Sequence, residues 1–299
     1  MDNYTIISII TPSFNHVAYI EETIKSVVTQ EGSFFLDYIV MDGGSTDNTT
    51  DILKDYERKI SAGTDFLEDR GLKFYKGRGG EQLVNCKGIS FRWFSEKDKG
   101  QADAINKGFR MAVGEILAFL NSDDTYYPGT IQKVISTKWR NADFIYGQGM
   151  WISKEGKELL LYPTFKPNKY NFVYQCTLCQ PAVFMKRSTY EKLGEFSHDF
   201  NVVFDFEYWM RAVFRKMKFR YIDSVLATSR FYVENKTMAQ KETQVNEVPL
   251  LKEKYYIKPF NAYERFMVRK ARDKVHRQTV ERVNKLHELI RSDIRYEFK

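Results

Sequence analysis

The sequence predicts an α/β fold, in which a doubly wound, mostly parallel sheet is followed by a helical C-terminal extension. Over the first 150 residues, short apolar runs alternate with amphipathic helical segments, and repeated βα units of this kind build parallel sheets. The second half is less regular, and beyond Thr237 the chain is helical in character. With 299 residues, the chain can bury a substantial core as one large domain or two small ones.

The first two βα units follow this pattern closely. Residues 6–10 are almost continuously apolar, as expected for a strand covered on both faces. Residues 20–28 then place apolar side chains on one helical face. A second strand over 38–41 leads into Asp42–Asp47, whose hydroxyl and carboxylate side chains suit the cap of a helix that includes residues 52–60.

Residues 61–88 interrupt the alternation, because they are rich in glycine and charge and show little periodicity. We expect a long loop or a small inserted hairpin. Its basic side chains are expected to be solvated, with contact to an acidic acceptor as the alternative. These side chains are Arg70, Lys73, Lys76, Arg78 and Lys87.

The alternation resumes after this insertion. Residues 89–93 alternate as a strand, 101–113 form a predicted helix, and 116–120 form a buried strand. Asn121–Asp124 follows directly, and a fifth strand is expected at 143–146. Short connections between these units predict a doubly wound parallel sheet.

The second half contains fewer regular units. We expect a hairpin over 150–162, a strand over 181–187 and a helix over 204–216. The helical tail carries a narrow apolar stripe, which is too narrow to form a core of its own. The stripe consists of Val283, Leu286, Ile290 and Ile294.

The C-terminal tail supplies most of the net charge of +7. Residues 259–299 contain eleven Lys and Arg against six Asp and Glu, which leaves +5. Because this charge forms a terminal appendage and not a stripe across a fold, nucleic acid is not an expected partner. The tail is expected to lie on an anionic membrane, or to pack against a helix of its own chain or of a second subunit as a homodimer.

The sequence suggests a cytoplasmic protein. No apolar run approaches the ~18 residues of a membrane span, and no basic-then-apolar signal segment stands at the N-terminus. Three cysteines cannot all pair, which fits a reducing compartment. The lone CxxC at Cys176–Cys179 favours idle thiols over a zinc site. If the tail binds lipid, the protein would lie at the inner face of the cell membrane.

Acidic residues follow three of the predicted strands. They are Asp42, Glu96 with Asp98, and Asp123 with Asp124. The carboxyl ends of parallel strands meet at one edge, so these groups are expected to share a cleft. Adjacent carboxylates suit a hard divalent cation that bridges to substrate phosphates. The alternative is that the last pair belongs to an ordinary acidic turn that caps the next helix.

Glycines in this region have a different pattern from those of the common nucleotide-binding loops. Gly43 and Gly44 permit close backbone approach to a ligand. The chain lacks both GxGxxG and GxxxxGK[ST], so neither a dinucleotide fold nor a P-loop is predicted.

Five segments resemble, in order and spacing, the successive motifs of glycosyltransferase family 2, whose members are inverting sugar transferases of the GT-A fold. The segments are Ser8–Asn15, Asp42–Asp47, Ser95–Gln101, Asn106–Gly108 and Leu120–Asp124. The resemblance extends over about residues 5–235. It divides the chain into a GT-A-like domain at 1–235, with the 61–88 insertion, and a helical basic extension at 236–299.

The resemblance implies a donor site at these motifs. It places Asp42 at the nucleotide base, with Thr11 and Pro12 beneath. The family's metal motif is usually Asp-x-Asp; here Asn121 stands first, which leaves Asp123, together with Asp124, to bind Mg²⁺ or Mn²⁺. The implied donor-binding residues are Thr11, Pro12, Asn15, Asp42, Gly44, Asp98, Gln101, Asn106, Asn121 and Ser122.

The resemblance also implies a catalytic base. Phe204–Arg211 is similar to the family's helix that opens near the acceptor, with Asp205 at the position of the base. The alternative is that Asp205 is a first-turn acid favoured by the helix dipole.

Further residues are expected around the substrates. Gln180, Trp151 and Trp209 are candidates for the acceptor side, because apolar sugar faces pack well on aromatic rings. Arg230 and Lys236 are candidates to close over the diphosphate, by resemblance to the family's terminal segment.

These features predict a metal-dependent inverting glycosyltransferase that uses a nucleotide-diphosphate sugar, expected to be UDP-linked. The acceptor would be a hydroxyl of a glycan or of a lipid-linked acceptor in surface-polysaccharide synthesis. One alternative is a non-catalytic basic adaptor whose tail binds membrane, RNA or a partner helix, which leaves the acidic residues without a role. Another is a nucleotidyltransferase, for which the chain shows no phosphate loop.

Overall fold

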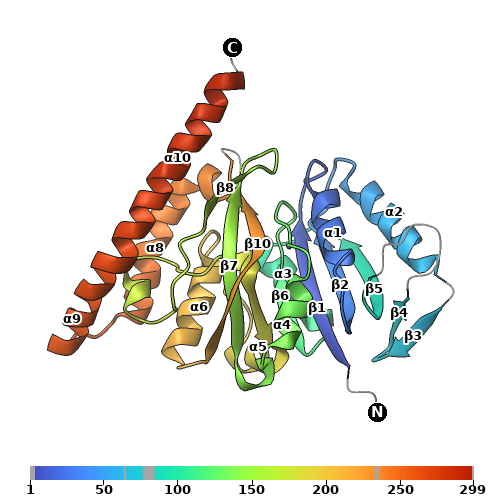
Figure 1. Cartoon of the computed structure of the whole chain (residues 1–299), viewed down its shortest axis with the longest axis horizontal. Helices are drawn as coiled ribbons and strands as arrows, with labels where there is room; N and C mark the ends of the chain where they lie inside the picture. Colours follow the sequence, from blue (N-terminus) through green and yellow to red (C-terminus); the bar gives the residue numbers. More distant parts are fainter. Residues whose placement is uncertain (1–3, 64, 77–84, 233–235, 298–299) are drawn as a thin grey trace.

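The computed structural model describes residues 4–63, 65–76, 85–232 and 236–297. A ten-stranded sheet runs through the molecule with helices on both sides (Figure 1). The strands are β1 (Thr5–Ser13), β2 (Phe34–Asp42), β3 (Phe66–Asp69), β4 (Leu72–Tyr75), β5 (Gly88–Ser95), β6 (Ile116–Phe119), β7 (Phe144–Ile152), β8 (Glu158–Leu161), β9 (Val183–Lys186) and β10 (Phe219–Arg230). The helices are α1 (Ile20–Val28), α2 (Thr49–Ser61), α3 (Gln101–Met111), α4 (Thr130–Ser136), α5 (Arg187–Leu193), α6 (Phe204–Phe214), α7 (Lys236–Ala239), α8 (Lys241–Tyr255), α9 (Ala262–Ala271) and α10 (Arg277–Glu297).

The strand order is β10-β7-β9-β6-β1-β2-β5-β4-β3, and β8 pairs with β7. Strands β6, β1, β2 and β5 are mutually parallel, as the sequence predicts. Their registers bring Ser13 beside Asp42 and Asp42 beside Ser95. The carboxyl ends of β1, β2 and β5 therefore lie level with one another at one edge of the sheet.

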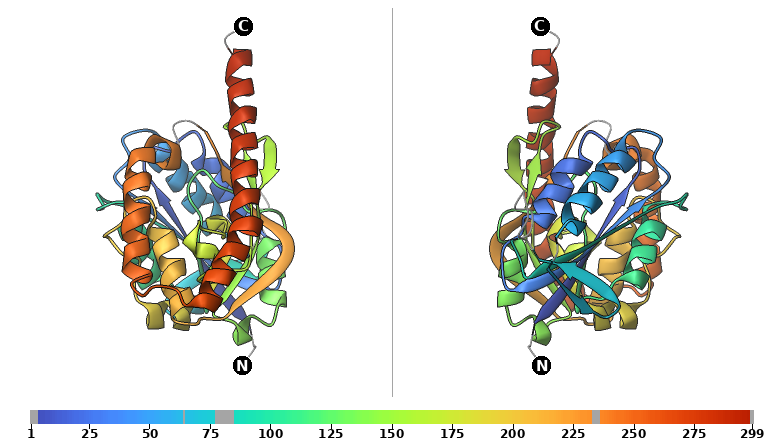
Figure 2. Two further views of the ribbon diagram at one scale, coloured as in Figure 1. Left: turned by 90° about the vertical axis from the view of Figure 1, so that its left-hand side faces the viewer. Right: turned by 90° about the vertical axis from the view of Figure 1, so that its right-hand side faces the viewer.

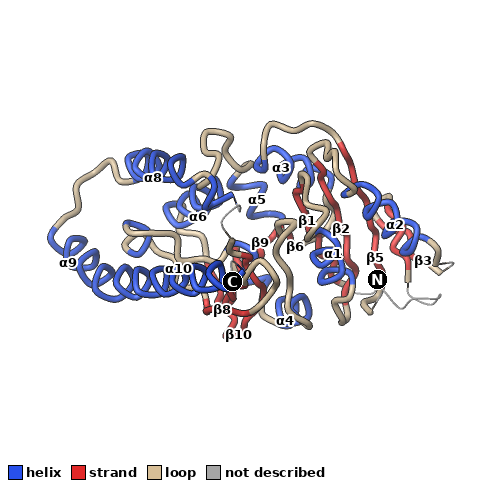
Figure 3. Tube along the Cα trace, turned by 90° about the horizontal axis from the view of Figure 1, so that it is seen from above, coloured by secondary structure: helices blue, strands red, loops and turns tan. Residues whose placement is uncertain are grey.

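Neighbouring residues of β1 enter different cores, which explains its continuous apolar run. Ile9 packs in a cluster with side chains of α1, α2 and α4. Ile10 packs in a second cluster with side chains of α3, α5 and α6. Figure 3 shows the sheet between these two helical layers. Both Ile9 and Ile10 are fully buried, so a strand covered on both faces is confirmed.

The half of the sheet beyond β6 is mixed. β9 is antiparallel to both β6 and β7, and β10 pairs parallel with β7. The hairpin expected at 150–162 is present as β7 and β8. Strand β10 was not predicted, because two register shifts between Tyr221 and Ala227 break its alternating pattern.

The insertion after α2 forms a small hairpin, which is one of the two structures expected there; the other was a long loop. β3 and β4 pair antiparallel, and Tyr75 of β4 joins the hairpin to β5 at Ile89. Three of its basic residues pair with carboxylates of the same chain: Arg70 with Glu115, Lys73 with Glu68 and Lys76 with Asp65. Residues 77–84, including Arg78, lie outside the described residues.

The acidic turn after β6 does not cap the following helix. Helix α4 begins after Gly129, which has a φ of 75° and provides no side-chain hydrogen bond to the helix. The carboxylates of Asp123 and Asp124 are thus available for other contacts.

The C-terminal helices pack against the rest of the chain. Leu251 of α8 is fully buried in the cluster that contains α6. α9 and α10 form one long rod, joined by the π turn Arg272–His276, that runs beside the β8 hairpin (Figures 1 and 2). Leu286 of α10 is also fully buried, so the described part of the predicted stripe packs on its own chain. The side chains of Ile290 and Ile294 lie outside the described part.

The described helices include none with the length and hydropathy of a membrane span.

Candidate active site

The loop after β2 is organised around Asp42, whose side chain is 2% exposed. Its Oδ2 atom accepts hydrogen bonds from Ser45 N at 2.9 Å, Gly44 N at 3.2 Å and Ser95 Oγ at 2.6 Å. Its Oδ1 atom accepts another from Ser45 Oγ. The carboxylate therefore shapes the loop that was expected to hold the nucleotide base. Gly44 has a φ of 86°, a conformation in which glycine costs least.

The loop after β1 is fastened to the β2 loop. Asn15 Oδ1 accepts a hydrogen bond from Thr46 N at 2.8 Å, and Asn15 N donates to Ser45 Oγ at 2.8 Å. The neighbouring Phe14 is 58% exposed and lies against Gly43. An exposed ring beside a glycine-lined loop offers a flat apolar surface at this edge of the sheet.

Asp98 lies at the same place, on the loop between β5 and α3. A Cβ atom on Gly43 would come within 2.8 Å of Asp98 Oδ2, so the two loops lie in close contact here. The other oxygen, Oδ1, accepts a hydrogen bond from Gly100 N at 2.8 Å. The two acidic loops predicted to converge therefore do so.

Asp123 and Asp124 have different environments although they are adjacent. Asp124 is 3% exposed, and its Oδ1 atom accepts a hydrogen bond from Arg230 N at 2.8 Å. Burial and the neighbouring Asp123 charge raise the pKa of Asp124. Asp123 is partly exposed, and its Oδ2 atom accepts a hydrogen bond from Tyr232 Oη at 3.1 Å. Asp123 is thus the carboxylate of the pair that can reach a ligand.

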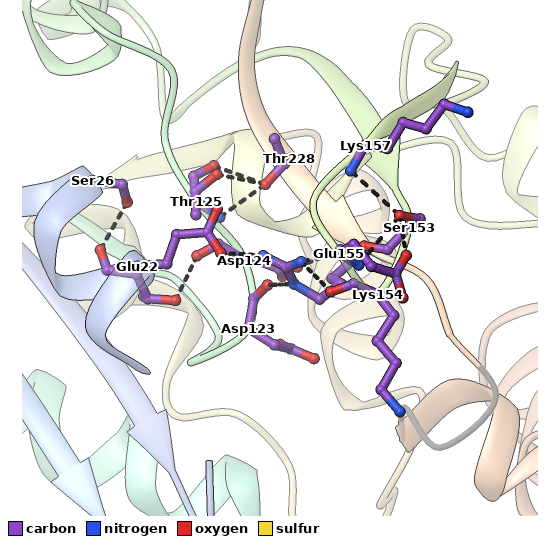
Figure 4. A network of polar contacts seen from close by, with 12 residues as sticks. Glu22, Ser26, Asp123, Asp124, Thr125, Ser153, Lys154, Glu155, Lys157 and Thr228 are labelled. Atoms are coloured by element: carbon purple, nitrogen blue, oxygen red, sulfur yellow. Dashed lines mark hydrogen bonds and ion pairs between the residues drawn. The ribbon is translucent and has the colours of Figure 1, made fainter. Parts of the chain in front are cut away.

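Arg230 holds this acidic turn in place. Its side chain donates to Asp123 O at 2.9 Å, to Lys154 O at 2.7 Å and to Glu22 Oε2 at 2.5 Å. Figure 4 shows Glu22 and Lys154 on opposite sides of the turn and the Asp123 side chain pointing away from this network. Arg230 is 4% exposed, so its guanidinium binds oxygen atoms of the protein and does not line an open diphosphate site.

A chain of hydrogen bonds leads from the acidic turn to α7. Asn121 Nδ2 donates to Asp124 Oδ2 at 3.3 Å, and Gln101 Nε2 donates to Asn121 Oδ1 at 2.6 Å. Lys236 Nζ then donates to Gln101 Oε1 at 3.1 Å. The N-terminus of α3 is therefore linked to the turn after β6 on one side and to the C-terminal helices on the other.

Asp205 lies in the first turn of α6. Burial raises its pKa to about 6, against the lowering effect of the Phe206 N–H and the Lys236 charge. Phe206 N donates to Asp205 Oδ1 at 2.7 Å. Within the described residues, no hydrogen bond from another residue reaches Oδ2. A carboxylate with a pKa near neutrality and one open oxygen is suited to accept a proton.

Gln180 lies close to the end of β6. Its Nε2 atom donates to Phe119 O at 2.8 Å, while its Oε1 atom is buried without a hydrogen-bond partner in the described part of the chain. Such an atom can accept a hydrogen bond from a substrate.

Four other residues proposed from the sequence are buried in the scaffold. Thr11 contacts Tyr38 Oη at 3.0 Å beneath the site, and Pro12 is buried beside it. Asn106 is fully buried, and its amide exchanges two 2.9 Å hydrogen bonds with the backbone of Phe196. Trp209 is 2% exposed and packs against Phe144 and other rings, so it does not form a wall of an open site.

Trp151 is 6% exposed and packs against Tyr162 at 5.0 Å between ring centroids. Its position is at the end of β7, next to the β8 hairpin. Its side chain therefore supports that hairpin in the structure.

Sequence analysis did not identify several residues of this region. His16 Nδ1 lies 2.6 Å from Ser122 Oγ, which ties the β1 loop to the acidic turn. Tyr232 contacts Asp123, and Glu22 anchors Arg230. The two members of each pair lie more than 100 residues apart in the sequence, and no local sequence pattern predicts such contacts.

Comparison with known proteins gives the family of the chain. The model of Glycosyl transferase family 2 matches residues 8–78 and 80–216. This match covers more than half of the 299 residues, so the chain belongs to glycosyltransferase family 2. The resemblance expected from the sequence motifs is therefore confirmed.

Similar curated proteins carry glycosyltransferase names. An uncharacterized glycosyltransferase of Rickettsia conorii is 26% identical over 77% of this chain and 35% of its own length. The putative teichuronic acid biosynthesis glycosyltransferase TuaG of Bacillus subtilis is 32% identical over 43% of this chain and 40% of its own length. Among the similar Rickettsia proteins of this kind, the part matched by this chain amounts to about a third to two thirds of their own length.

Solved structures share the fold. Residues 1–349 of S. aureus TarS, in complex with UDP-GlcNAc, align with a TM-score of 0.57 and 15% identity, over 88% of this chain and 70% of that one. The mannosyltransferase PcManGT from Pyrobaculum calidifontis, in complex with GDP-Man and Mn²⁺, aligns with a TM-score of 0.59 and 14% identity, over 92% of this chain and 71% of that one. The GT-A-like fold with its helical C-terminal region is confirmed.

Proposed function

We propose that this family 2 glycosyltransferase moves a sugar from a nucleotide-diphosphate donor, most simply a UDP-sugar, to an acceptor hydroxyl with inversion at the anomeric carbon. The observation that carries the proposal is the pairing of two unlike carboxylates. Both are partly exposed, but Asp123 lies on the turn after β6 with one oxygen bound by Tyr232, whereas desolvation at the start of α6 raises the pKa of Asp205 to about 6. Lys236 and Gln101 connect the two regions. Carboxylates in such different environments suit different tasks.

The donor would lie across the carboxyl ends of β1, β2 and β6. Phe14 and the loop held by Asp42 offer an apolar face and backbone groups for a nucleotide base. The diphosphate would then reach the turn that contains Asp123. TarS and PcManGT are solved with UDP-GlcNAc and GDP-Man respectively, which supports a nucleotide-sugar donor of this kind.

A divalent cation, Mg²⁺ or Mn²⁺, fits beside Asp123. No cluster of three or more His, Cys, Asp or Glu side chains that could hold a metal occurs within the described residues. Mg²⁺ commonly uses one or two carboxylates and completes its shell with substrate phosphates and water, so a single exposed carboxylate is sufficient. When bound, the ion would neutralise charge on the departing diphosphate. Tyr232 holds one Asp123 oxygen, which leaves the other for the ion.

Asp205 would serve as the general base. Its ionised form accepts the proton of the acceptor hydroxyl while that oxygen attacks the anomeric carbon from the face opposite the diphosphate. The new C–O bond forms as the bond to the diphosphate breaks, so a single displacement inverts the configuration. Gln180 Oε1 is positioned to accept a hydrogen bond at the end of β6.

The acceptor is proposed to be a glycan or a lipid-linked acceptor of surface-polysaccharide synthesis. The printed name of TuaG, which refers to teichuronic acid biosynthesis, supports an acceptor of this class. A lipid-linked acceptor would bring the enzyme to the cytoplasmic face of a membrane.

A surface suited to that membrane is segment 257–270, which lies at the end of the molecule formed by α9 (Figure 3). Ile257, Tyr263 and Phe266 are 80%, 65% and 61% exposed. The segment carries four exposed basic side chains, and its one acid, Glu264, pairs with Lys169. Exposed aromatic and basic side chains together suit an anionic lipid surface. A symmetric dimer through this segment would oppose like charges.

Vesicle co-sedimentation tests this surface. Anionic vesicles should bind the wild-type protein at low salt and release it at high salt. Replacing Tyr263 and Phe266 by Ser should weaken binding at least fivefold, whereas Phe66→Ser, on the β3 hairpin at the far end of the molecule, should not. Equal binding by both variants would reject segment 257–270 as the lipid-binding surface.

The proposed transfer is tested with a panel of UDP- and GDP-sugars in the presence of Mn²⁺, with hydrolysis or transfer measured by release of the nucleotide. One donor should be consumed, and the Asp205→Asn variant should bind it with unchanged affinity but turn it over at least 100-fold more slowly. If no nucleotide binds, the basic-adaptor hypothesis gains support instead.

A further inference from the structure

The N-terminus of α6 lacks the usual side-chain cap. The first N–H groups of a helix have no partner within it, and they are normally satisfied by a polar side chain at the N-cap. Here the N-cap is Val203, which provides no such side chain. Asp205, the proposed base, stands two residues further along this first turn.

Glu247 of α8 binds the backbone of the turn that leads into α6, up to the N-cap residue itself. Its Oε1 atom accepts a hydrogen bond from Asn201 N at 2.6 Å. Its Oε2 atom accepts from Val202 N at 2.9 Å and from Val203 N at 3.1 Å. A carboxylate at this end of a helix also interacts favourably with the helix dipole.

The same turn is held by two further side chains from the C-terminal region. Lys236 Nζ donates to Asn201 O at 2.6 Å, and Gln240 Oε1 accepts from Asn201 Nδ2 at 2.9 Å. Residues 236–247 therefore bind both the backbone and the side chain of Asn201. We call these residues the strap.

The strap also reaches the donor side of the site. Lys236 Nζ donates to Gln101 Oε1, and Gln101 in turn binds Asn121 beside the acidic turn. The ammonium group lowers the pKa of Asp205. One lysine thus contacts the turn that carries the proposed base and the helix that adjoins the proposed donor site.

Helix α8 continues beyond the strap, and this continuation is fixed to the core. Leu251 of α8 is fully buried against the cluster that contains α6, and Tyr255 Oη donates to Glu207 Oε1 of α6. Glu207 also forms an ion pair with Arg211. α8 and α6 are therefore held together independently of Glu247.

We infer that residues 236–247, which follow the part of the chain matched by the family model, position Asp205 relative to the donor. Glu247 fixes the turn from which α6 starts, and Lys236 fixes the spacing between that turn and α3. Both act as positioning residues, and the inference rests on the proposed role of Asp205 as the base. Small displacements of a reacting group are costly, since a shift of about 1 Å can lower a rate about 100-fold.

Steady-state kinetics of Glu247→Ala tests this inference. We expect kcat to fall 10-fold or more, with little change in the affinity for UDP measured by calorimetry. Glu247→Gln keeps an amide oxygen that can accept these N–H groups, so it should restore part of the activity. Glu253→Ala is the matched control, because Glu253 is an exposed acid of the same helix.

The pH dependence of kcat/KM separates positioning from a loss of stability. Among the residues that the structure describes, Lys236 is the charged group that faces Asp205. Burial keeps the pKa values of Tyr162, Cys176 and Cys179 above their ordinary range, so these groups are neutral. Lys236→Met should therefore move the acid limb of the profile to higher pH. Glu253→Ala should leave it unchanged.

Three results would overturn the inference. The first is a folded Glu247→Ala variant whose kcat and pH profile equal those of Glu253→Ala. The second is an equal loss of UDP affinity and turnover, which would assign the strap to donor binding. The third is a thermal destabilisation of Glu247→Ala with unchanged kcat. Failure of the proposed function is distinguishable, because Asp205→Asn would then retain full turnover.

Discussion

At the scale of residues, burial separates side chains that look equivalent in the sequence. Asp123 and Asp124 are adjacent acids, yet one is partly exposed and the other is 3% exposed and bound to the backbone of Arg230. The acidic turn itself was predictable because it follows a buried strand directly. Which acid faces a ligand depends on Arg230, which lies more than 100 residues away and is held by Glu22 and the β7–β8 hairpin.

The two acids should therefore respond differently to truncation. Asp124→Ala leaves the buried N–H of Arg230 without an acceptor, which should cost about 2–3 kcal/mol of stability. Asp123→Ala removes a partly exposed side chain and should change the free energy of unfolding by less than about 0.5 kcal/mol. Urea unfolding of the two variants checks this, and equal losses would mean that Asp123 is also structural.

Asp205 should make the stability of the protein depend on pH. Its pKa is raised from 3.8 to about 6 in the folded chain, so folding favours the protonated form. The resulting contribution is fully present below about pH 4 and is lost as the pH rises through about 6. Asp205→Asn should therefore be more stable than the wild type by about 1–2 kcal/mol at pH 8 and nearly equal to it near pH 4.

Thermal unfolding of the wild-type and Asp205→Asn proteins at pH 8 and near pH 4 tests this pH dependence. A variant that is less stable than the wild type at pH 8 would mean that Asp205 is a helix-stabilising acid, as the alternative drawn from the sequence holds.

At the scale of elements, the sequence was most informative where strands are covered on both faces. β1, β2 and β6 were located from their apolar runs, because each strand buries both sets of alternating side chains. β5 was located from its alternating pattern, and its last four residues are not buried. β9 lies within the strand expected over 181–187, but its antiparallel pairing was not foreseen, and neither was β10, whose two register shifts leave a weak pattern. The GT-A resemblance identified the site motifs but not the hydrogen bonds that join them.

The close contact between α3 and β1 provides a test at this scale. A Cβ atom on Gly108 would lie 2.5 Å from Ile10 Cγ2. Alanine improves helix propensity by about 1 kcal/mol, but overpacking a core commonly costs 1–3 kcal/mol. We expect the clash to dominate, because Ile10 is fully buried and has little room to move.

Gly108→Ala should thus lower the free energy of unfolding by about 1–2 kcal/mol. In an Ile10→Ala background the same change should be neutral or stabilising, since the clashing methyl groups are gone. Denaturant unfolding of the wild type, the two single variants and the double variant completes the cycle. An equal loss of unfolding free energy in both backgrounds would rule out the contact as the cause.

At the scale of the whole molecule, the C-terminal region divides into parts with different relations to the core. The sequence suggested an extension from residue 236 onward, yet α8 contributes Leu251 to the core and Glu247 to the start of α6. α9 and α10 lie further out and meet the β8 hairpin and the loop after it, where Arg282 donates to Leu161 O at 3.2 Å. Helical propensity was predictable from the sequence, whereas membership of the core depends on contacts across the fold.

Two truncations test this division. A chain ending at residue 258 keeps α8 and should unfold within a few degrees of the full-length protein, with unchanged affinity for UDP. A chain ending at residue 235 exposes the face of α6 that Leu251 covers, and loss of such a buried leucine alone costs about 2–5 kcal/mol. We expect its Tm to fall by 8 °C or more, as measured by calorimetry. Equal Tm values for the two truncated chains would make 1–235 a complete domain.

The most direct test of a metal-assisted glycosyltransferase with a separate base is calorimetric titration of UDP into the wild-type, Asp123→Ala and Asp205→Asn proteins, each with Mn²⁺ and with EDTA. We expect UDP to bind the wild-type and Asp205→Asn proteins with similar affinity in Mn²⁺, and at least 10-fold more weakly in EDTA. Asp123→Ala should show the weak binding under both conditions. Binding that is independent of Mn²⁺ in all three proteins would contradict the role given to Asp123, and loss of UDP binding in Asp205→Asn would contradict the separation of base and donor site.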